Sequence, residues 1–151
     1  METLTIEPRG SVHILWLNRP ERRNAINRRM LEELDVALAD LARSDECRVI
    51  VLAGKGSSFC AGFDIGRGEG GFAPASDPVS DADDLTWRMD RFLAIWDHPK
   101  PVVAAVHGNC IAAGTLLCMF ADLTIVERDA QIRSEEHTSE LQSRETISYA
   151  V

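Results

Sequence analysis

Three consecutive small residues, Ala112 to Gly114, separate two apolar runs of the chain. The first run, Val102 to Val106, precedes Gly108 and predicts a strand that is buried on both faces, as in a parallel sheet. The second run, Leu116 to Phe120, predicts a buried helix with the small residues at its N-terminal end. The N–H groups there lack intrahelical acceptors and small side chains leave them accessible, so they could bind a polarised oxygen atom.

A purely structural interpretation of this stretch stays open. A strand, a glycine turn and an apolar helix occur throughout α/β proteins. The small residues could serve only to let the helix pack closely on the sheet. A ligand site therefore needs a second group of residues that meets the first.

A second loop, Ser57 to Gly66, supplies such a group. It follows the apolar strand expected over Arg48 to Ala53 and reads SSFCAGFDIG. The loop is too short for a regular element, yet it keeps Phe59, Phe63 and Ile65, so it either folds against the core or lines a pocket. Because both loops leave the C-terminal ends of parallel strands, where such sheets place ligands, we expect them to converge.

The elements that position these loops follow from apolar spacing. Residues 3–17 predict a hairpin, and Asn27 is the expected N-cap of the helix that follows it. The next helix is expected to begin at an Asp83-Asp84 cap, and Leu123 to Val126 predict a strand before a turn at 128–130. The two helices have apolar stripes at helical spacing, which are Ile26, Met30, Leu34, Leu38 and Leu41 in the first and Leu85, Met89, Phe92, Leu93 and Trp96 in the second. Alternating strands and helices predict an α/β fold.

Composition excludes several classes of protein. The chain of 151 residues has a formal net charge of −8 and no basic block, which argues against a nucleic-acid partner. No apolar segment approaches membrane-spanning length, and the first residues lack a secretory or transit character, so we expect no membrane association and a cytoplasmic location. Cys47, Cys60, Cys110 and Cys118 have no metal-ligand spacing and are interpreted as buried free thiols, with no metal site.

One glycine motif is misleading. Residues 66–71 fit the GxGxxG pattern of dinucleotide-binding loops. That pattern needs a strand before it and a helix after it, whereas here a proline-containing segment follows. We therefore expect a surface loop.

Three motifs together resemble the enoyl-CoA hydratase/isomerase (crotonase) superfamily. They are Asn18-Arg19-Pro20 with Asn24-Ala25 and Asn27, then Phe59 to Ile65, then Lys100 to Asp122. Their order and spacing make the resemblance specific over residues 1 to about 132, roughly the N-terminal half of a family member. It implies a crotonase-like spiral of ββα repeats, incomplete at the C-terminus, in a homotrimer or hexamer. It also implies an acyl-CoA substrate, with coenzyme A as part of that substrate and no separate metal or redox cofactor.

The resemblance also assigns site residues. The backbone N–H groups of Phe63 and Ala113 would form an oxyanion hole for the thioester oxygen, in agreement with the expected convergence of the two loops. The implied substrate-binding positions are Ala61, Asp64, Ile65, Gly66, Gly114, Leu116, Arg22, Arg23 and Ala25. Arg22 and Arg23 could pair with the phosphates of coenzyme A or form a solvated loop, and Asp64 could face the pocket or hold the loop.

One position departs from the family pattern. Hydratases of the family have a glutamate where this chain has Leu116, and leucine cannot transfer a proton. Family isomerases often lack that acid and use a single base further along the chain. Leu116 therefore favours double-bond isomerisation over hydration. The alternatives are a non-catalytic acyl-CoA-binding member and an inactive fragment.

The end of the chain also departs from the pattern. Residues 133–143 read RSEEHTSELQS, which has no buried stripe and resembles a translated sequencing adapter. We therefore expect an acyl-CoA-binding core over residues 1–132 and an artefactual tail over 133–151, and a truncated chain with little activity.

Overall fold

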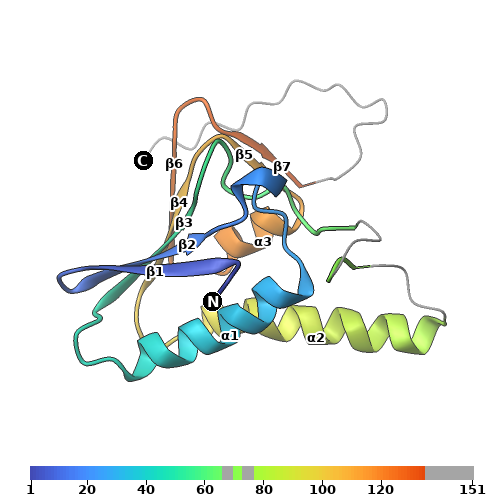
Figure 1. Ribbon diagram of the computed structural model, residues 1–151, viewed down its shortest axis with the longest axis horizontal. Coiled ribbons are helices and arrows are strands. Elements are labelled where there is room, and N and C mark those ends of the chain that lie inside the picture. The colour runs from blue at the N-terminus through green and yellow to red at the C-terminus, as the bar shows by residue number, and fades with distance from the viewer. Residues whose placement is uncertain (66–69, 73–76, 135–151) are drawn as a thin grey trace.

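The computed structural model describes residues 1–65, 70–72 and 77–134 (Figure 1). The strands are β1 Leu4–Arg9, β2 Val12–Leu17, β3 Val49–Gly54, β4 Val102–Val106, β5 Asn109–Ile111, β6 Leu123–Val126 and β7 Gln131–Arg133. The helices are the short 3-10 helix η1 Pro20–Arg22, α1 Arg28–Arg43, α2 Pro78–Trp96 and α3 Ala113–Met119.

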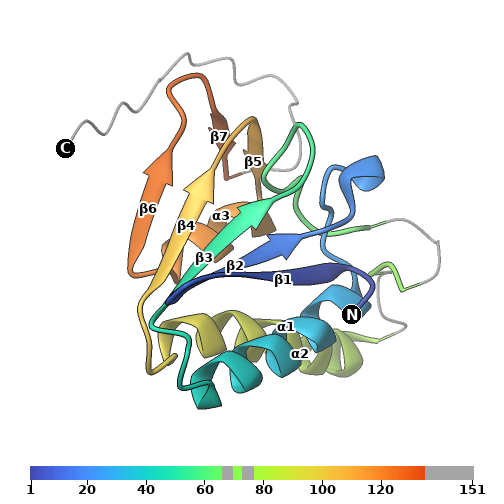
Figure 2. The same cartoon turned by 60° about the vertical axis from the view of Figure 1, so that its left-hand side comes forward.

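The main sheet has the strand order β1-β2-β3-β4-β6 (Figure 2). Its first two strands form the predicted antiparallel hairpin, and every later pair is parallel, which confirms the α/β fold. The helices lie on one side of this sheet. A second sheet, parallel β5 and β7, was not expected, because each of its strands has only three residues.

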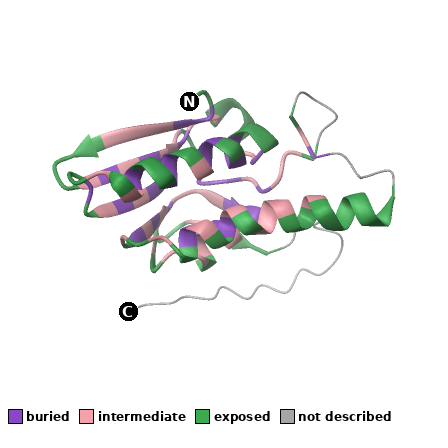
Figure 3. Cartoon of the chain, turned by 90° about the horizontal axis from the view of Figure 1, so that it is seen from below, coloured by how far each residue is buried: buried purple, intermediate pink, exposed green. Residues whose placement is uncertain are grey.

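Helix α1 carries the packing that the sequence predicts. The Asn27 side chain accepts a hydrogen bond from the Met30 N–H and caps the first turn. All five residues of the expected stripe are buried against the sheet (Figure 3). The helix thus fixes the loop before it, which contributes to the site described below.

Helix α2 differs from its prediction. It begins at Pro78 rather than at Asp83, because the Asp77 side chain accepts hydrogen bonds from the Val79 and Ser80 N–H groups. The expected apolar stripe is wrong at three positions, since Leu85 is 55%, Leu93 39% and Trp96 65% exposed. Phe92 is buried as predicted, and Met89 is half-buried. The N-terminal half of α2 extends beyond the sheet, so most of its side chains have nothing in the described structure to pack against (Figure 3).

Helix α3 is shorter and less covered than expected. It begins at Ala113 and ends at Met119, which is 69% exposed. Its inner face, with Ala113, Gly114 and Leu117, is buried as predicted. The neighbouring strand β6 is correctly predicted, but it is a sheet edge with three exposed residues.

Several smaller expectations can be compared with the structure. Cys47, Cys60 and Cys110 are buried free thiols as predicted, whereas Cys118 is half-exposed. The β5–β7 pairing continues to Arg133, one residue past the expected end of the core.

In the part of the chain that the structure describes, no helix has the length and apolarity to span a membrane.

A buried carboxylate holds the beginning of the chain to α1. The Glu33 side chain accepts hydrogen bonds from the N–H groups of Glu2, Thr3 and Leu4 and from the Thr3 hydroxyl. Arg29 donates to it from the same helix. Burial raises the pKa of Glu33, but these donors outweigh it and lower the pKa from 4.5 to about 2.

We predict that Glu33→Gln lowers the free energy of unfolding by about 2–3 kcal/mol at neutral pH. The reason is that a carboxyl group whose pKa is lower in the folded than in the unfolded state stabilises the fold when it is ionised. Because the folded pKa is depressed, this contribution is present above the unfolded pKa of 4.5 and is lost as the pH falls toward about 2. Urea denaturation of both proteins at several pH values should show the difference shrinking below pH 4.5. The exposed neighbour provides a control, since Glu32→Gln should change little. An equal effect of both substitutions would contradict the prediction.

Candidate functional site

Main-chain hydrogen bonds join the loop before α1 to the loop after β3. Ile26 donates to the Gly62 carbonyl at 2.8 Å, and Asp64 donates to the Ile26 carbonyl at 2.8 Å. Ala61 donates to the Arg23 carbonyl at 3.0 Å. This is a short parallel bridge with Ile26 opposite Phe63. In such a bridge the hydrogen bonds to Ile26 are made by Gly62 and Asp64, the residues on either side of Phe63. The N–H group of Phe63 itself therefore points away from Ile26.

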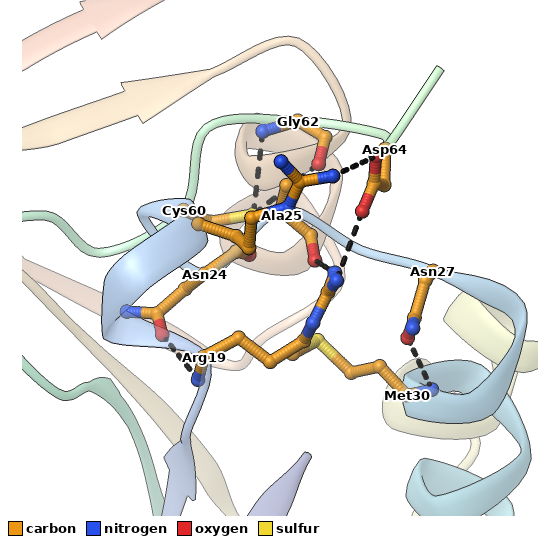
Figure 4. Close-up of polar contacts among 9 residues, drawn as sticks. Arg19, Asn24, Ala25, Asn27, Met30, Cys60, Gly62 and Asp64 are labelled. Atoms are coloured by element: carbon orange, nitrogen blue, oxygen red, sulfur yellow. Dashed lines mark hydrogen bonds and ion pairs between the residues drawn. The ribbon is translucent and has the colours of Figure 1, made fainter. Parts of the chain in front are cut away.

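A buried amide secures the same two loops. The Asn24 side chain is fully buried and donates to the carbonyls of Lys55 and Ser58. It also accepts a hydrogen bond from the Arg19 N–H (Figure 4). Asn24 has a φ of 56°, which asparagine tolerates better than most residues. Its side chain therefore satisfies three backbone groups, one in the loop before α1 and two in the loop after β3.

An ion pair forms a further link. Arg19 donates to Asp64 at 2.9 Å, and it also donates to the Ala25 carbonyl at 2.5 Å. Both side chains are largely buried, with 13% and 12% of their surfaces exposed. Arg22 approaches the other carboxylate oxygen of Asp64 at 3.8 Å but remains 54% exposed. Asp64 therefore holds the loop in place, whereas the Arg22 guanidinium remains largely exposed.

The beginning of α3 lies against the Cys60 part of the loop. Cys60 pairs with Cys110 of β5, donating to Asn109 O and accepting from Ile111 N. A Cβ atom added to Gly114 would lie 2.9 Å from Cys60 Cβ and 3.0 Å from Cys60 O. Glycine is thus required for this close approach. The predicted convergence of the two loops is confirmed at Cys60 and Gly114.

The N–H groups of Phe63 and Ala113 lie in these two segments. Neither Phe63 N–H nor Ala113 N–H donates a hydrogen bond to another residue in the described part of the chain. Ala112, just before the second group, has a φ of 47° and a ψ of −113°, which is strained for a residue with a Cβ atom. Strain of this kind is frequent where a backbone group is positioned for a ligand.

The Phe63 side chain lies in a row of aromatic rings. It makes edge contacts with Phe72 at 5.1 Å and with Phe92 at 6.0 Å between ring centroids. Guanidinium groups cover this row, since Arg88 lies 4.1 Å from the Phe72 ring centroid and 5.2 Å from that of Phe63. Asp84 pairs with both Arg28 and Arg88. The loop that carries Phe63 is thereby attached to α2.

The other predicted site residues are distributed around this arrangement. Ala61 and Ala25 are half-buried in the joined loops, Arg22 and Arg23 are exposed, and Leu116 packs partly buried against the core. Ile65 is 60% exposed, and Gly66 lies outside the described residues. Among the residues that the structure describes, no group of three or more His, Cys, Asp or Glu side chains is placed to hold a metal ion.

Sequence reasoning missed the residues that hold the loops together. Asn24 belongs to one of the three motifs, but its burial has no signal in periodicity because it lies in a loop. The pairing of Arg19 with Asp64 joins residues 45 positions apart, so spacing does not reveal it. The guanidinium–aromatic contacts of Arg28 and Arg88 were also missed, because arginine on a helix usually indicates a solvated face.

Comparison with known proteins identifies the family. The family described as enoyl-CoA hydratase/isomerase matches residues 7–139. The chain belongs to the enoyl-CoA hydratase/isomerase family. The match covers all three motifs and both loops of the site.

Relatives with known names span several activities. The chain is 35% identical over 138 residues to a mitochondrial Delta(3,5)-Delta(2,4)-dienoyl-CoA isomerase of Rattus norvegicus, which covers 82% of this chain and 40% of that protein. It is 35% identical over 136 residues to a 1,2-epoxyphenylacetyl-CoA isomerase of Escherichia coli, covering 87% and 50%. It is 42% identical over 120 residues to a probable enoyl-CoA hydratase of Mycobacterium bovis, covering 80% and 45%. The chain thus spans about half the length of the curated relatives it matches.

Solved structures of the enoyl-CoA hydratase/isomerase family share the fold. A putative family member from Novosphingobium aromaticivorans has a TM-score of 0.79 at 32% identity, over 86% of this chain and 46% of that one. A probable enoyl-CoA hydratase from Mycobacterium smegmatis has a TM-score of 0.76 at 34% identity, over 87% and 51%. The expected crotonase-like fold is therefore confirmed.

Substitutions at Gly114 and Ala112 should change the free energy of unfolding in opposite directions. Gly114→Ala should destabilise the fold by about 1–3 kcal/mol, because the new methyl group meets the Cys60 backbone. Ala112→Gly should be neutral or slightly stabilising, because it relieves the positive φ. Urea denaturation of the two variants measures both effects. A destabilisation of the same size at both positions would show that the close approach at Gly114 is not the cause.

Proposed function

We propose that the protein binds an acyl-CoA thioester and stabilises its enolate with the backbone N–H groups of Phe63 and Ala113. Removal of a proton from the α-carbon places negative charge on the thioester oxygen. Two fixed N–H donors at that oxygen lower the barrier, and the loss of one such donor typically costs about 3 kcal/mol. The donors act in this way whichever group removes the proton.

The main support is that both N–H groups lack an acceptor within the described chain, while the segments that carry them meet at Cys60 and Gly114. The names of the relatives, which are acyl-CoA isomerases and hydratases, agree with this chemistry. Enolate stabilisation by main-chain donors requires no metal or redox cofactor. Coenzyme A enters as part of the substrate.

We assign the coenzyme A end of the substrate to the loop before α1. Arg22 and Arg23 are exposed there, and Asp64 holds Arg22 near the entrance of the site at 3.8 Å. The acyl end of the substrate would contact Ala61, Ile65, Gly66, Gly114 and Leu116. The intact protein would assemble as a homotrimer or hexamer. Phosphate groups pair well with guanidinium groups, so this loop suits the charged end of the ligand.

Isomerisation is the reaction that we favour. Leu116 lies in the first turns of α3, two residues after Gly114, and has no group that transfers a proton. Hydration by two carboxylates would therefore lack one of them, whereas isomerisation returns the same proton to another carbon atom. Leu116 instead offers an apolar wall beside the reacting carbon atoms.

The first test measures turnover. Purified chain should slowly convert a 3-enoyl-CoA into the conjugated 2-enoyl-CoA, as followed by chromatographic separation of the two isomers, and mass spectrometry should show that no water is added. Ala113→Pro, which removes one N–H at a helix position that tolerates proline, should lower the rate by about 10²–10³-fold. Ala113→Ser keeps the N–H and should retain most of the activity. Water addition as the main reaction, or equal rates in both variants, would refute the assignment.

The second test concerns the loop before α1. Arg22→Gln should weaken the binding of coenzyme A by about three- to tenfold at low salt, as expected for one exposed charge pair. The difference from the unmodified protein should shrink as salt is added. Isothermal titration calorimetry measures both affinities. Arg9→Gln in the hairpin is the control, because Arg9 is exposed and pairs with Glu7 away from the loop. Equal weakening by both variants would indicate a general charge effect instead.

A non-catalytic acyl-CoA-binding protein is the second candidate. Leu116 favours it, because a missing proton donor is also what a binding member of the family would have. In that case the chain would bind the thioester and free coenzyme A, and the turnover assay would detect no product.

A further inference from the structure

Three of the four cysteines gather around the first turns of α3. Cys60 lies beneath Gly114, where an added Cβ would come 3.3 Å from its sulfur atom. Cys110 in β5 and Cys118 in α3 have their Sγ atoms 3.6 Å apart. Cys47 lies elsewhere, in the connection from α1 to β3, where its thiol faces Val49 O. The chain therefore contains one close thiol pair and one separate thiol for comparison.

We propose that Cys110 and Cys118 are an oxidisable dithiol site that forms an intramolecular disulfide with a hydroperoxide as oxidant. A disulfide has an S–S length of about 2.05 Å, so the sulfur atoms must approach by roughly 1.5 Å. Rotation of the half-exposed Cys118 side chain, which lies in the second turn of a short helix with one open face, can supply this movement.

The surroundings of the thiols favour this pair over the others. The contact between the two sulfur atoms lowers the pKa of Cys110, whereas the same contact and burial raise the pKa of Cys118. Cys110 is thus the member that more readily becomes a thiolate. Burial raises the pKa of Cys60 to about 12, so Cys60 stays protonated and unreactive although it lies nearby.

The reaction balances in two steps. The Cys110 thiolate first attacks the hydroperoxide ROOH, so the O–O bond breaks, a sulfenic acid forms on Cys110, and the leaving RO⁻ takes up the proton that Cys110 released. The Cys118 sulfur atom then attacks the Cys110 sulfur atom, forms the S–S bond and displaces hydroxide, which takes up the proton of Cys118 and leaves as water. Two thiols are oxidised, and one hydroperoxide is reduced to an alcohol and water. Because Cys110 is buried, the first step should be slow compared with that of an exposed sensor cysteine.

The disulfide would close a small ring around the proposed site. Residues 111–117, which include Ala113 and Leu116, lie between the two cysteines. The oxidised ring would restrict the turn that presents the Ala113 N–H, a consequence that rests on the proposed function. Formation of the disulfide itself does not depend on that function, so the experiment below tests it separately.

Trypsin separates the thiols into different peptides. Cys47 falls in residues 44–48, Cys60 in 56–67, and Cys110 with Cys118 in 92–128, since the Lys100–Pro101 bond resists cleavage. The folded full chain is treated with hydrogen peroxide, unfolded with N-ethylmaleimide present, digested and analysed by mass spectrometry. We expect peptide 92–128 to lose the mass of two hydrogen atoms and to escape alkylation until dithiothreitol is added. The Cys47 and Cys60 peptides should be alkylated in full.

Matched variants complete the test. Cys118→Ser should abolish the mass loss, and Cys47→Ser should leave it unchanged, with circular dichroism confirming that both variants fold. Three results would overturn the proposal. These are a disulfide that involves Cys60 or Cys47, a sulfinic acid on Cys110 in place of the disulfide, and full alkylation of peptide 92–128 after peroxide treatment.

Discussion

The main-chain pairing of Ile26 with Phe63 is the interaction on which the site depends. It joins the loop before α1, which contains the short 3-10 helix η1, to the loop after β3. Buried polar groups maintain this pairing, namely the Asn24 amide and the Arg19–Asp64 ion pair. Removing one member of a buried ion pair typically costs about 3–5 kcal/mol, because the other charge is left without a partner. The loops are therefore held by specific contacts rather than by general apolar packing.

The second support of the site comes from α2. This helix buries few apolar side chains, yet it attaches to the Phe63 loop through guanidinium groups that stack on aromatic rings. Asp84 balances the charges of Arg28 and Arg88. Cation–π contacts contribute about 0.5–2 kcal/mol each, and several in one cluster can replace part of a hydrophobic interface. A helix with a largely exposed N-terminal half can thus still fix one wall of the site.

The sequence predicts the regular elements better than the contacts between them. Apolar periodicity identified the hairpin, α1 and strands β3 and β4, because each of these buries apolar side chains along one face. It also identified β6, whose apolar residues are mostly exposed at the edge of the sheet. The predicted beginning of α2 was wrong, because Asp77, six residues before the Asp83-Asp84 pair, caps the helix and Pro78 begins it. The apolar stripe predicted for α2 is mostly exposed, because few other residues cover that helix. Strands β5 and β7 are too short to have a period. The meeting of Cys60 with Gly114 was expected from topology, whereas the roles of Asn24 and Arg19 depend on contacts over 30 or more residues.

Ile26 belongs to two parts of the molecule at once. Its side chain is in the hydrophobic core, while its N–H and carbonyl bind the residues on either side of Phe63. Any change that repacks the core at this residue will also move the loop that bears the Phe63 amide. The stability of the core and the position of the Phe63 amide therefore share one residue, and an engineer who wishes to alter one without the other has to leave this position untouched.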